Sequence, residues 1–374
     1  MNAESAITRA NWRTPPVLRL AFRHIDRILP VATIAHDPAR VVALPEAPRD
    51  FDALRLNLQG ATLTWPEFLR RTHTDGIAVL HDGRLVHEWL DDGMTADTRH
   101  IVMSASKSMV GLLCGALAAR GLLDPSAPVA HYVPEVADSG YRGASLRDLM
   151  DMRAQPGFSE AELQRYAWAT NWDVPPDGVA AAGLHEFFAA LPPRATTHGG
   201  PFRYLSPNTD LLGWAIERAG GRPFAALAGE LLWAPTGAQH DAAITVDRDG
   251  APRATGGLSM TLRDLARVGQ FVLDADGAMG AWIADILDHG DPAAWAQGDF
   301  AQAFGRRMHY RSGWYVMRDE PRMLFAMGIH GQHLFVDPAH RLVVAKLSAQ
   351  PQALDAQATG WTMRAVAELR RALG

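Results

Sequence analysis

Residues 103–117 read MSASKSMVGLLCGAL. The apolar residues from Met109 to Leu117 recur at helical spacing, which predicts a helix. The helical pattern begins at Ser106, and Gly121 supplies a natural C-terminal stop. The stretch therefore predicts a helix whose first turn follows directly on a run of serines.

The start of this helix carries a Ser-x-x-Lys motif, formed by Ser104 and Lys107. Two residues three apart at the start of a helix stand one above the other, which places the lysine amine within hydrogen-bond reach of the serine hydroxyl. A neutral lysine there can accept the serine proton, and the hydroxyl can then attack a carbonyl carbon. The positive end of the helix lies near the developing oxyanion. The motif alone leaves a second interpretation equally open, a helix N-cap followed by a solvated lysine.

The scarcity of lysine favours the catalytic interpretation. The 374-residue chain has 36 basic residues, of which only Lys107 and Lys346 are lysines. Arginine does not release its proton in proteins, whereas a partly buried lysine can. A lysine retained in such a chain therefore indicates a role in proton transfer.

On both sides of this helix, the sequence predicts one antiparallel sheet assembled from the two ends of the chain. Asp82-Gly83 separates two strand-like runs within residues 76–89, which is the strongest hairpin signal in the chain. Further helices are expected at residues 17–28, 209–219, 262–273 and 358–373, and further strands at 312–317, 323–327, 333–336 and 342–347. The predicted fold class is α/β in the α+β sense, with helices flanking the sheet.

The same pattern divides the chain into three parts. Residues 1–70 are expected to form an N-terminal extension that packs on the sheet domain. Residues 71–105 and 251–374 are expected to form that α/β sheet domain, and residues 106–250 a mostly helical inserted domain.

Two further motifs are candidates for the same site. Tyr204 lies on a proline-bearing loop just before a predicted helix, where its phenol could relay a proton. Beside a cationic lysine, its pKa would fall. Residues 328–333 read GIHGQH, and the backbone N–H of Gln332 could complete an oxyanion hole. His330 and His333 could instead bind a metal, but no partner pair at metal-ligand spacing lies nearby, so we expect neither metal nor cofactor.

Composition excludes several other classes of function. The formal net charge of −5 argues against nucleic acid or an acidic membrane surface as the main partner. No stretch approaches the roughly 20 apolar residues of a membrane span, and residues 1–16 lack the apolar core of a signal peptide. Cys114 is the single cysteine and is expected to be a buried, inert thiol. We therefore expect a soluble cytoplasmic protein that does not bind membranes.

In their order and spacing, the three motifs resemble the serine β-lactamase and penicillin-recognising superfamily, whose sets are Ser-x-x-Lys, Tyr-x-Asn/Ser and Lys/His-Thr/Ser-Gly. The closer likeness is to its branch of esterases and 6-aminohexanoate-dimer hydrolases. The resemblance covers nearly the whole chain and includes residues 11–16, 81–83, 121–129, 256–267 and 335–338. It implies a β-lactamase-like fold that contains an antiparallel sheet and an inserted helical domain.

The resemblance also implies roles for individual residues. Ser104 would be the nucleophile, Lys107 its general base and Tyr204 the second proton carrier, while the N–H groups of Ser104 and Gln332 would form the oxyanion hole. Tyr166 and Trp172 belong to a segment that can form a mobile lid in such hydrolases. The residues expected near the substrate are Gln332, Ser206, His330, Gly331, Tyr166, Trp172 and Trp314, although large aromatic residues more often belong to the core.

The chain departs from the family pattern at three places. Ser206 falls where penicillin-processing members often have asparagine, with Asn208 two places further on. The third motif aligns as residues 329–331 and lacks the lysine that holds the carboxylate of the antibiotic in β-lactamases. Residues 152–157 read MRAQPG where relatives have Met-Thr-Ser-Gly, which is expected to alter a loop beside the site.

The first two departures argue against β-lactam turnover but leave acyl transfer intact. The predicted function is a serine hydrolase that cleaves a small amide or ester through an acyl-enzyme on Ser104. The alternatives are a β-lactamase or D-alanyl carboxypeptidase, and a non-catalytic sensor or binding protein that keeps the fold. The partner is expected to be a small molecule, and the sequence leaves open whether the chain forms a homodimer.

Overall fold

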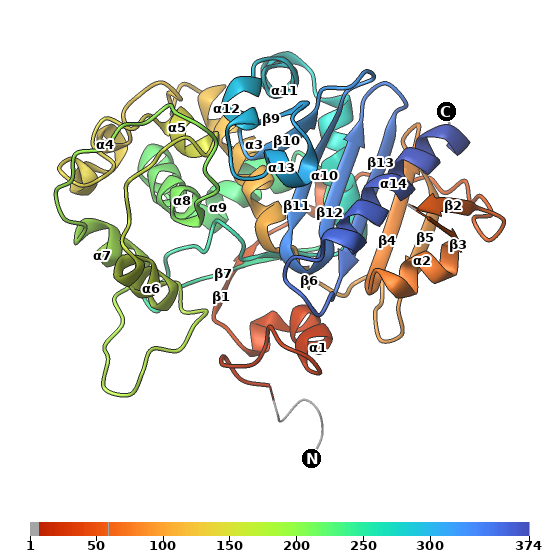
Figure 1. The fold of residues 1–374 in the computed structure, drawn as a ribbon, viewed down its shortest axis with the longest axis horizontal. Coiled ribbons are helices and arrows are strands. Elements are labelled where there is room, and N and C mark those ends of the chain that lie inside the picture. The colour runs from red at the N-terminus through yellow and green to blue at the C-terminus, as the bar shows by residue number, and fades with distance from the viewer. Residues whose placement is uncertain (1–6, 59, 374) are drawn as a thin grey trace.

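The largest element of the fold is a seven-stranded antiparallel sheet with the order β5-β4-β13-β12-β11-β10-β9. The computed structural model describes residues 7–58 and 60–373. Residues 1–6 and 59 of the expected extension, and residue 374 of the expected sheet domain, lie outside this range. The strands are β4 (Thr74–His81), β5 (Arg84–Leu90), β9 (Met308–Arg311), β10 (Trp314–Met317), β11 (Met323–Gly328), β12 (Gln332–Asp337) and β13 (Leu342–Ser348). Because β4 pairs with β13, the predicted sheet built from both ends of the chain is confirmed (Figure 1).

The predicted hairpin joins β4 to β5, with His81 paired to Arg84. Asp82 and Gly83 between them have φ angles of 49° and 72°. A type I′ turn requires this left-handed conformation at both of its central residues, and Asp-Gly is a favoured pair there. The chemistry of the turn therefore fixes which residues of the two strands face each other.

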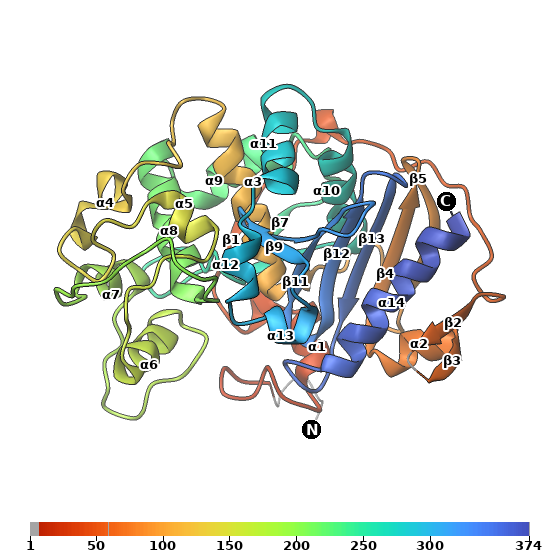
Figure 2. The same ribbon diagram turned by 45° about the horizontal axis from the view of Figure 1, so that its top comes forward.

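Both faces of the sheet are covered by helices, because apolar side chains point to both sides of each strand. On β12, Leu334 and Val336 belong to the core on one face, whereas Phe335 belongs to the core on the other. Helix α10 (Leu262–Asp274) packs on the first face and α14 (Ala356–Leu373) on the second, as Figure 1 and Figure 2 show.

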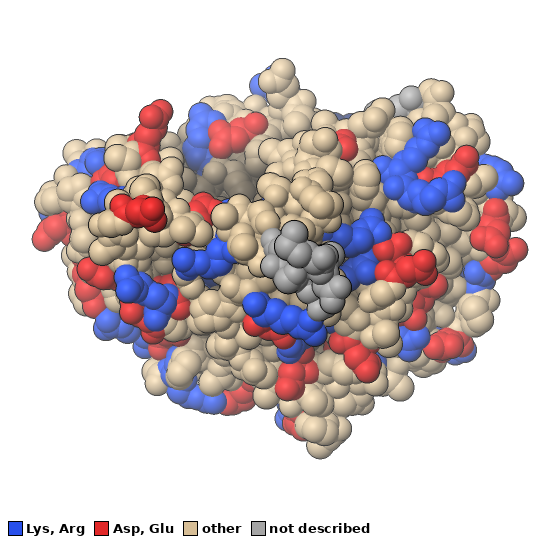
Figure 3. Space-filling view, turned by 90° about the horizontal axis from the view of Figure 1, so that it is seen from below, with Lys and Arg blue, Asp and Glu red and all other residues tan. Residues whose placement is uncertain are grey.

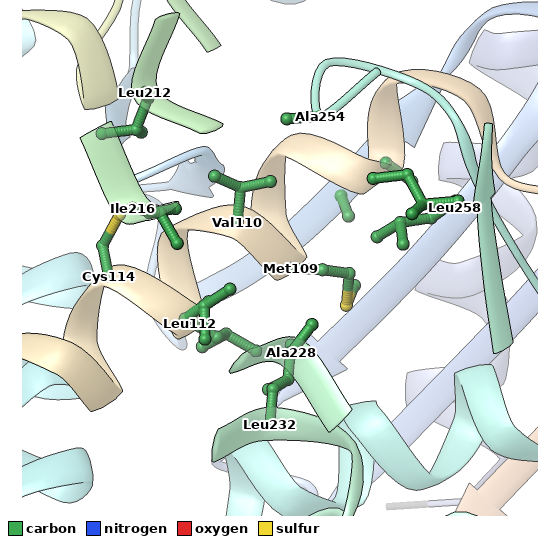
Figure 4. Close-up of a cluster of buried hydrophobic side chains, with 14 of the residues drawn as sticks. Met109, Val110, Leu112, Cys114, Leu212, Ile216, Ala228, Leu232, Ala254 and Leu258 are labelled. Atoms are coloured by element: carbon green, nitrogen blue, oxygen red, sulfur yellow. The ribbon is translucent and has the colours of Figure 1, made fainter. Parts of the chain in front are cut away.

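Helix α3 (Ser106–Ala118) runs between the sheet and the helical region, and its residues from Ser106 to Leu117 are all buried. Figure 4 shows Met109, Val110 and Leu112 of α3 among side chains of α8 (Ser206–Gly220) and of the π-helix η6 (Gly229–Trp233). A helix that is apolar all round belongs in the interior of a protein. Since the interior is closely packed, a group at the start of α3 is held in a nearly fixed position.

The helical region lies on the far side of α3 from the sheet (Figure 1). Its other helices are α4 (Val129–Tyr132), η5 (Pro134–Val136), α5 (Leu146–Met150), α6 (Glu160–Ala169), α7 (Leu184–Ala189) and α9 (Phe224–Ala228). Three more helices lie between α10 and β9: α11 (Gly277–Asp288), α12 (Pro292–Ala296) and α13 (Ala301–Phe304). The sequence analysis predicted a mostly helical segment over residues 106–250 and located α8 within a few residues, but it did not predict α11, α12 or α13.

A four-stranded sheet that the sequence analysis did not predict has the order β1-β7-β8-β6. Its strands are β1 (Val31–Ile34), β6 (His100–Ile101), β7 (Ala242–Thr245) and β8 (Leu258–Met260). Because β1 pairs with β7 along its whole length, the N-terminal extension packs on more than the expected sheet domain. These strands are too short for an alternating pattern to stand out in the sequence.

The N-terminal extension also contains several short elements. The helix expected at residues 17–28 is two helices, α1 (Leu18–Arg23) and η2 (Ile25–Arg27), interrupted at His24. The remaining elements of the extension are η3 (Pro38–Arg40), β2 (Arg55–Leu58), β3 (Ala61–Thr64) and α2 (Trp65–Arg71). In the hydrophobic cluster on the α14 face of the large sheet, Leu56 of β2 and Phe68 of α2 join Trp361 of α14.

Charged side chains of both signs are interspersed on the face of the molecule shown in Figure 3, which carries the N-terminal segment. Mixed charges of this kind are ordinary for a protein surface. Within residues 7–58 and 60–373, no helix combines the length and the apolar character that crossing a membrane requires.

Candidate active site

Ser104 and Lys107 lie at the junction between the 3₁₀ turn η4 (Met103–Ala105) and α3. The Lys107 Nζ atom is 3.0 Å from Ser104 Oγ and donates a hydrogen bond to the carbonyl oxygen of Thr255 over 2.9 Å. Lys107 is buried, whereas Ser104 is partly exposed. Ser104 is therefore more accessible from solvent than the amine behind it.

Burial lowers the pKa of Lys107 well below its ordinary value, and the nearby charge of Arg253 lowers it further, while Asp210 acts in the opposite direction. Desolvation disfavours the charged form of an amine. A neutral Lys107 has a lone pair that can accept the Ser104 proton, and this is the protonation state required of a general base.

Tyr204 lies just before α8, and its ring is 4.8 Å from Lys107 Nζ. Its hydroxyl is hydrogen-bonded to the side chains of Ser104 and Tyr315. Burial raises the pKa of Tyr204 to about 12, so the expectation that a cationic lysine would lower it is wrong. Desolvation of the phenolate outweighs the hydrogen bonds and the nearby charge of Arg253, which act in the opposite direction, and Tyr204 keeps its proton at neutral pH.

The end of the β11–β12 hairpin lies directly against the nucleophile. A Cβ atom on Gly328 would come within 3.0 Å of the Ser104 backbone nitrogen and 2.5 Å of the Val102 carbonyl oxygen. Only glycine allows this close approach. Gly328 pairs with Gln332 across the two strands, so the sheet register places Gln332 beside Ser104. The two expected donors of an oxyanion hole are therefore neighbours in space.

The turn η7 (Ile329–Gly331) contains His330, the histidine of the third motif. Its Nδ1 atom lies 2.7 Å from the carbonyl oxygen of Gln350, and its ring packs edge-on against Phe22 at 5.2 Å. Burial lowers the pKa of His330 below its ordinary value, and the charge of Arg13 adds to the effect. His330 therefore carries little positive charge near neutral pH.

Gly331 and Ser206 are the small residues expected near the substrate. Gly331 has a φ of 89°, and a Cβ on it would lie 2.5 Å from Gln350 Nε2. The tight turn at this position therefore requires glycine. Ser206 is the first residue of α8 and is partly buried. Asn208, two residues later, is fully buried and bonded to the Tyr141 hydroxyl and the Ala154 carbonyl oxygen. Asn208 therefore holds α8 to the 152–157 loop.

The aromatic residues expected near the substrate differ in their positions. The Tyr166 hydroxyl is 2.6 Å from an Asp210 carboxylate oxygen, and Trp172 Nε1 donates to Thr245 Oγ1 over 3.0 Å. Trp172 also lies against Gly256, next to the Thr255 carbonyl that binds Lys107. Trp314 is 0% exposed and belongs to the main core, so the structure does not support a substrate contact from it.

The sequence analysis missed three residues that surround Lys107: Asp210, Arg253 and Thr255. Asp210 is fully buried in α8 and forms an ion pair with Arg253, which also bonds to the Tyr166 hydroxyl. One sequence signal could have identified Asp210. It directly precedes Leu211 and Leu212 on a predicted helix and so lies close to the apolar side of that helix. An acidic residue is seldom buried there unless it is paired. Arg253 and Thr255 lie in a loop, where no periodic pattern marks them.

Among the residues that the structure describes, no group of three or more His, Cys, Asp and Glu side chains is arranged to hold a metal ion. The free thiol of Cys114 is buried in the α3 core, where burial raises its pKa to about 12. The thiol is thus protonated and enclosed, as expected from the sequence.

Comparison with known proteins agrees with this geometry. A family model described as Beta-lactamase matches residues 67–368. The chain belongs to the Beta-lactamase family. Within it, the chain is 35% identical over 357 residues to the 6-aminohexanoate-dimer hydrolase of Paenarthrobacter ureafaciens, covering 92% of this chain and 88% of that protein. Together with the family match, this relationship identifies the chain as a serine hydrolase.

Two further Beta-lactamase family similarities are informative. A solved Bacillus anthracis protein, provisionally assigned as a 6-aminohexanoate-dimer hydrolase, superposes with a TM-score of 0.88 at 22% identity and covers 99% of this chain and 98% of its own. At this identity, the likeness concerns the fold alone. A segment of 98 residues is 37% identical to the esterase/beta-lactamase LipL of Mycobacterium tuberculosis, covering 24% of this chain and 22% of LipL.

Proposed function

We propose that the enzyme hydrolyses small esters and linear amides through an acyl-enzyme on Ser104. The observation that carries the proposal is the 3.0 Å separation between Ser104 Oγ and a Lys107 amine that is buried and desolvated. The serine is partly exposed at the same point. This is the arrangement of an activated nucleophile, in which a general base lies within hydrogen-bond reach of the attacking hydroxyl.

The proposed acylation begins when Lys107 accepts the Ser104 proton and Oγ bonds to the substrate carbonyl carbon. The N–H groups of Ser104 and Gln332 stabilise the negative charge that develops on the carbonyl oxygen. Tyr204 then donates its proton to the leaving amine or alcohol as the bond to carbon breaks, and it recovers a proton from Lys107. Water hydrolyses the acyl-enzyme by the same proton transfers in reverse.

The charges around the site favour a substrate with no carboxylate beside the scissile carbonyl. His330 has a lowered pKa. The charges of Arg253 and Arg13 are already paired, with Asp210 and Asp173 respectively. A carboxylate at that position would lose hydration without gaining a cationic partner. The relationship to a 6-aminohexanoate-dimer hydrolase supports a linear amide of that kind as the amide substrate.

Labelling and kinetics test the proposal together. A fluorophosphonate probe is expected to modify Ser104, as located by peptide mass spectrometry, and Ser104→Ala is expected to be folded, unlabelled and inactive. A label on Ser106, Ser108 or Ser259 with Ser104 unmodified would overturn the assignment. An unlabelled wild-type protein with no turnover would instead indicate a sensor or binding protein.

Substrate preference is measured as kcat/KM for p-nitrophenyl butyrate, the linear 6-aminohexanoate dimer and nitrocefin under one set of conditions. We expect the ester or the linear amide to be the best substrate and nitrocefin the poorest. Nitrocefin as the best of the three would instead identify a β-lactamase.

A further inference from the structure

A buried ion pair lies next to Lys107 and takes no part in the proposed proton transfers. Asp210 of α8 has a fully buried side chain, and the Arg253 side chain is 10% exposed. The Arg253 guanidinium lies over the rings of Tyr166 and Trp172, at 5.1 Å and 5.0 Å from their centres. A buried ion pair is weak evidence for stability, because desolvation offsets its attraction. Its presence beside the catalytic amine therefore calls for another explanation.

The Asp210 carboxylate is connected to the Lys107 amine through one residue, Thr255. Asp210 Oδ1 accepts a hydrogen bond from the Thr255 N–H over 2.8 Å. The carbonyl oxygen of Thr255 accepts one from Lys107 Nζ over 2.9 Å, and Nζ is 3.0 Å from Ser104 Oγ. The Asp210 carboxylate thus holds Thr255 in place, and the Thr255 carbonyl in turn holds the Lys107 amine.

The orientation of a neutral amine depends on such an anchor. A neutral Lys107 has two N–H bonds and one lone pair, and only the lone pair can accept the Ser104 proton. When one N–H donates to Thr255, rotation about the last side-chain bond is restricted. The lone pair can then remain directed at Ser104 Oγ.

We propose that Asp210 is a positioning residue, which holds Thr255 so that the Lys107 amine is aimed at Ser104. The inference rests on the proposed function, because it assumes that Lys107 is the base. Asp210 touches neither the substrate nor the reacting atoms. Its second carboxylate oxygen binds Tyr166 and Arg253, which fixes the carboxylate itself in place.

The variants are chosen to separate the hydrogen bond from the charge. Replacing Asp210 alone would leave Arg253 buried without a partner, which is strongly destabilising. Both variants therefore carry Arg253→Met, which removes the ion pair as a whole. Asp210→Asn retains an oxygen for the Thr255 N–H, whereas Asp210→Leu has nearly the same shape and no acceptor. The two double variants have the same net charge.

The experiment measures kcat and KM for p-nitrophenyl butyrate per active site, with active sites counted by fluorophosphonate titration. We expect Asp210→Asn/Arg253→Met to stay within about fivefold of wild type. We expect Asp210→Leu/Arg253→Met to lose about 10²-fold in kcat with KM nearly unchanged, the scale of a misplaced catalytic group. A merely structural role would lower the melting temperature and the number of active sites, but not kcat per site.

Equal kcat values for the two double variants would overturn the proposal. Should the leucine variant not fold, Asp210→Ala/Arg253→Met, which also lacks an acceptor for the Thr255 N–H, takes its place. A kcat at least tenfold below that of the asparagine variant supports the proposal, and an equal kcat contradicts it. Failure of the proposed function has a different signature, because wild-type Ser104 would then remain unlabelled.

Discussion

At the scale of single residues, the exchange of Lys107 for arginine tests whether the site needs a base or only a charge. We expect Lys107→Arg to lose about 10²–10⁴-fold in kcat/KM, nearly as much as Lys107→Ala, because arginine keeps its proton at neutral pH. The measurement is ester hydrolysis at neutral pH, with circular dichroism to verify folding. Substantial activity in Lys107→Arg would indicate that Lys107 acts only through its charge.

The other proton carrier, Tyr204, is expected to act as an acid, because burial raises its pKa to about 12. Tyr204→Phe should lose about 10²–10⁴-fold in kcat. Its proton is lost only as pH rises through about 12, so the wild-type kcat profile should show no decline assigned to Tyr204 between pH 7 and 10. Activity of Tyr204→Phe within about threefold of wild type would remove Tyr204 from the mechanism.

Among the elements of the fold, the turn between β9 and β10 holds α3 at Lys107. Ser108 Oγ donates to the carbonyl oxygen of Gly313 over 2.6 Å, and a Cβ on Gly313 would lie 2.2 Å from the Lys107 carbonyl oxygen. We expect Gly313→Ala to lower both the free energy of unfolding and kcat, since the clash displaces the first turn of α3.

Gly305→Ala is the matched control for this turn. Gly305 has a φ of 89°, close to the 82° of Gly313, but a Cβ there would meet nothing within 4 Å. Both variants carry a backbone strain of about 1–3 kcal/mol. Only Gly313→Ala should also lose activity, as measured by urea unfolding and ester hydrolysis. Equal kcat values in the two variants would show that the turn does not position Lys107.

At the scale of the whole molecule, a buried carboxylate ties the N-terminal segment to both sheets. Asp75 of β4 is fully buried and pairs with Arg23 of α1 at 2.6 Å and with His100 of β6 at 3.0 Å. Burial acts to raise its pKa, but the hydrogen bond with His100 and the charges of His100, Arg23 and Arg19 outweigh it, so the pKa lies below its ordinary value.

Asp75→Asn is expected to lower the free energy of unfolding by about 1–3 kcal/mol at pH 7, because it removes the buried carboxylate that Arg23 and His100 share, while Arg23 keeps its ion pair with Asp91. A lowered carboxyl pKa gives stability that is present above the ordinary pKa of about 3.9 and is lost as pH falls through the lowered value. The difference between wild type and variant should therefore shrink below about pH 4. Urea unfolding at several pH values measures it, with Asp319→Asn in the exposed Arg307–Asp319 pair as the control. An equal effect of the two substitutions would contradict the role of Asp75.

Sequence patterns were enough to predict the large sheet except for β9, the hairpin at Asp82-Gly83, the helix after Ser104 and the Ser-x-x-Lys pair. These features depend on local periodicity, turn chemistry and short spacings, which neighbouring residues carry in full. The pairing of β1 with β7, the burial of Trp314 and the high pKa of Tyr204 became visible in the folded molecule alone. The tertiary structure alone placed Asp210 and Arg253 beside Lys107, because burial and long-range contacts depend on segments that lie far apart in the chain.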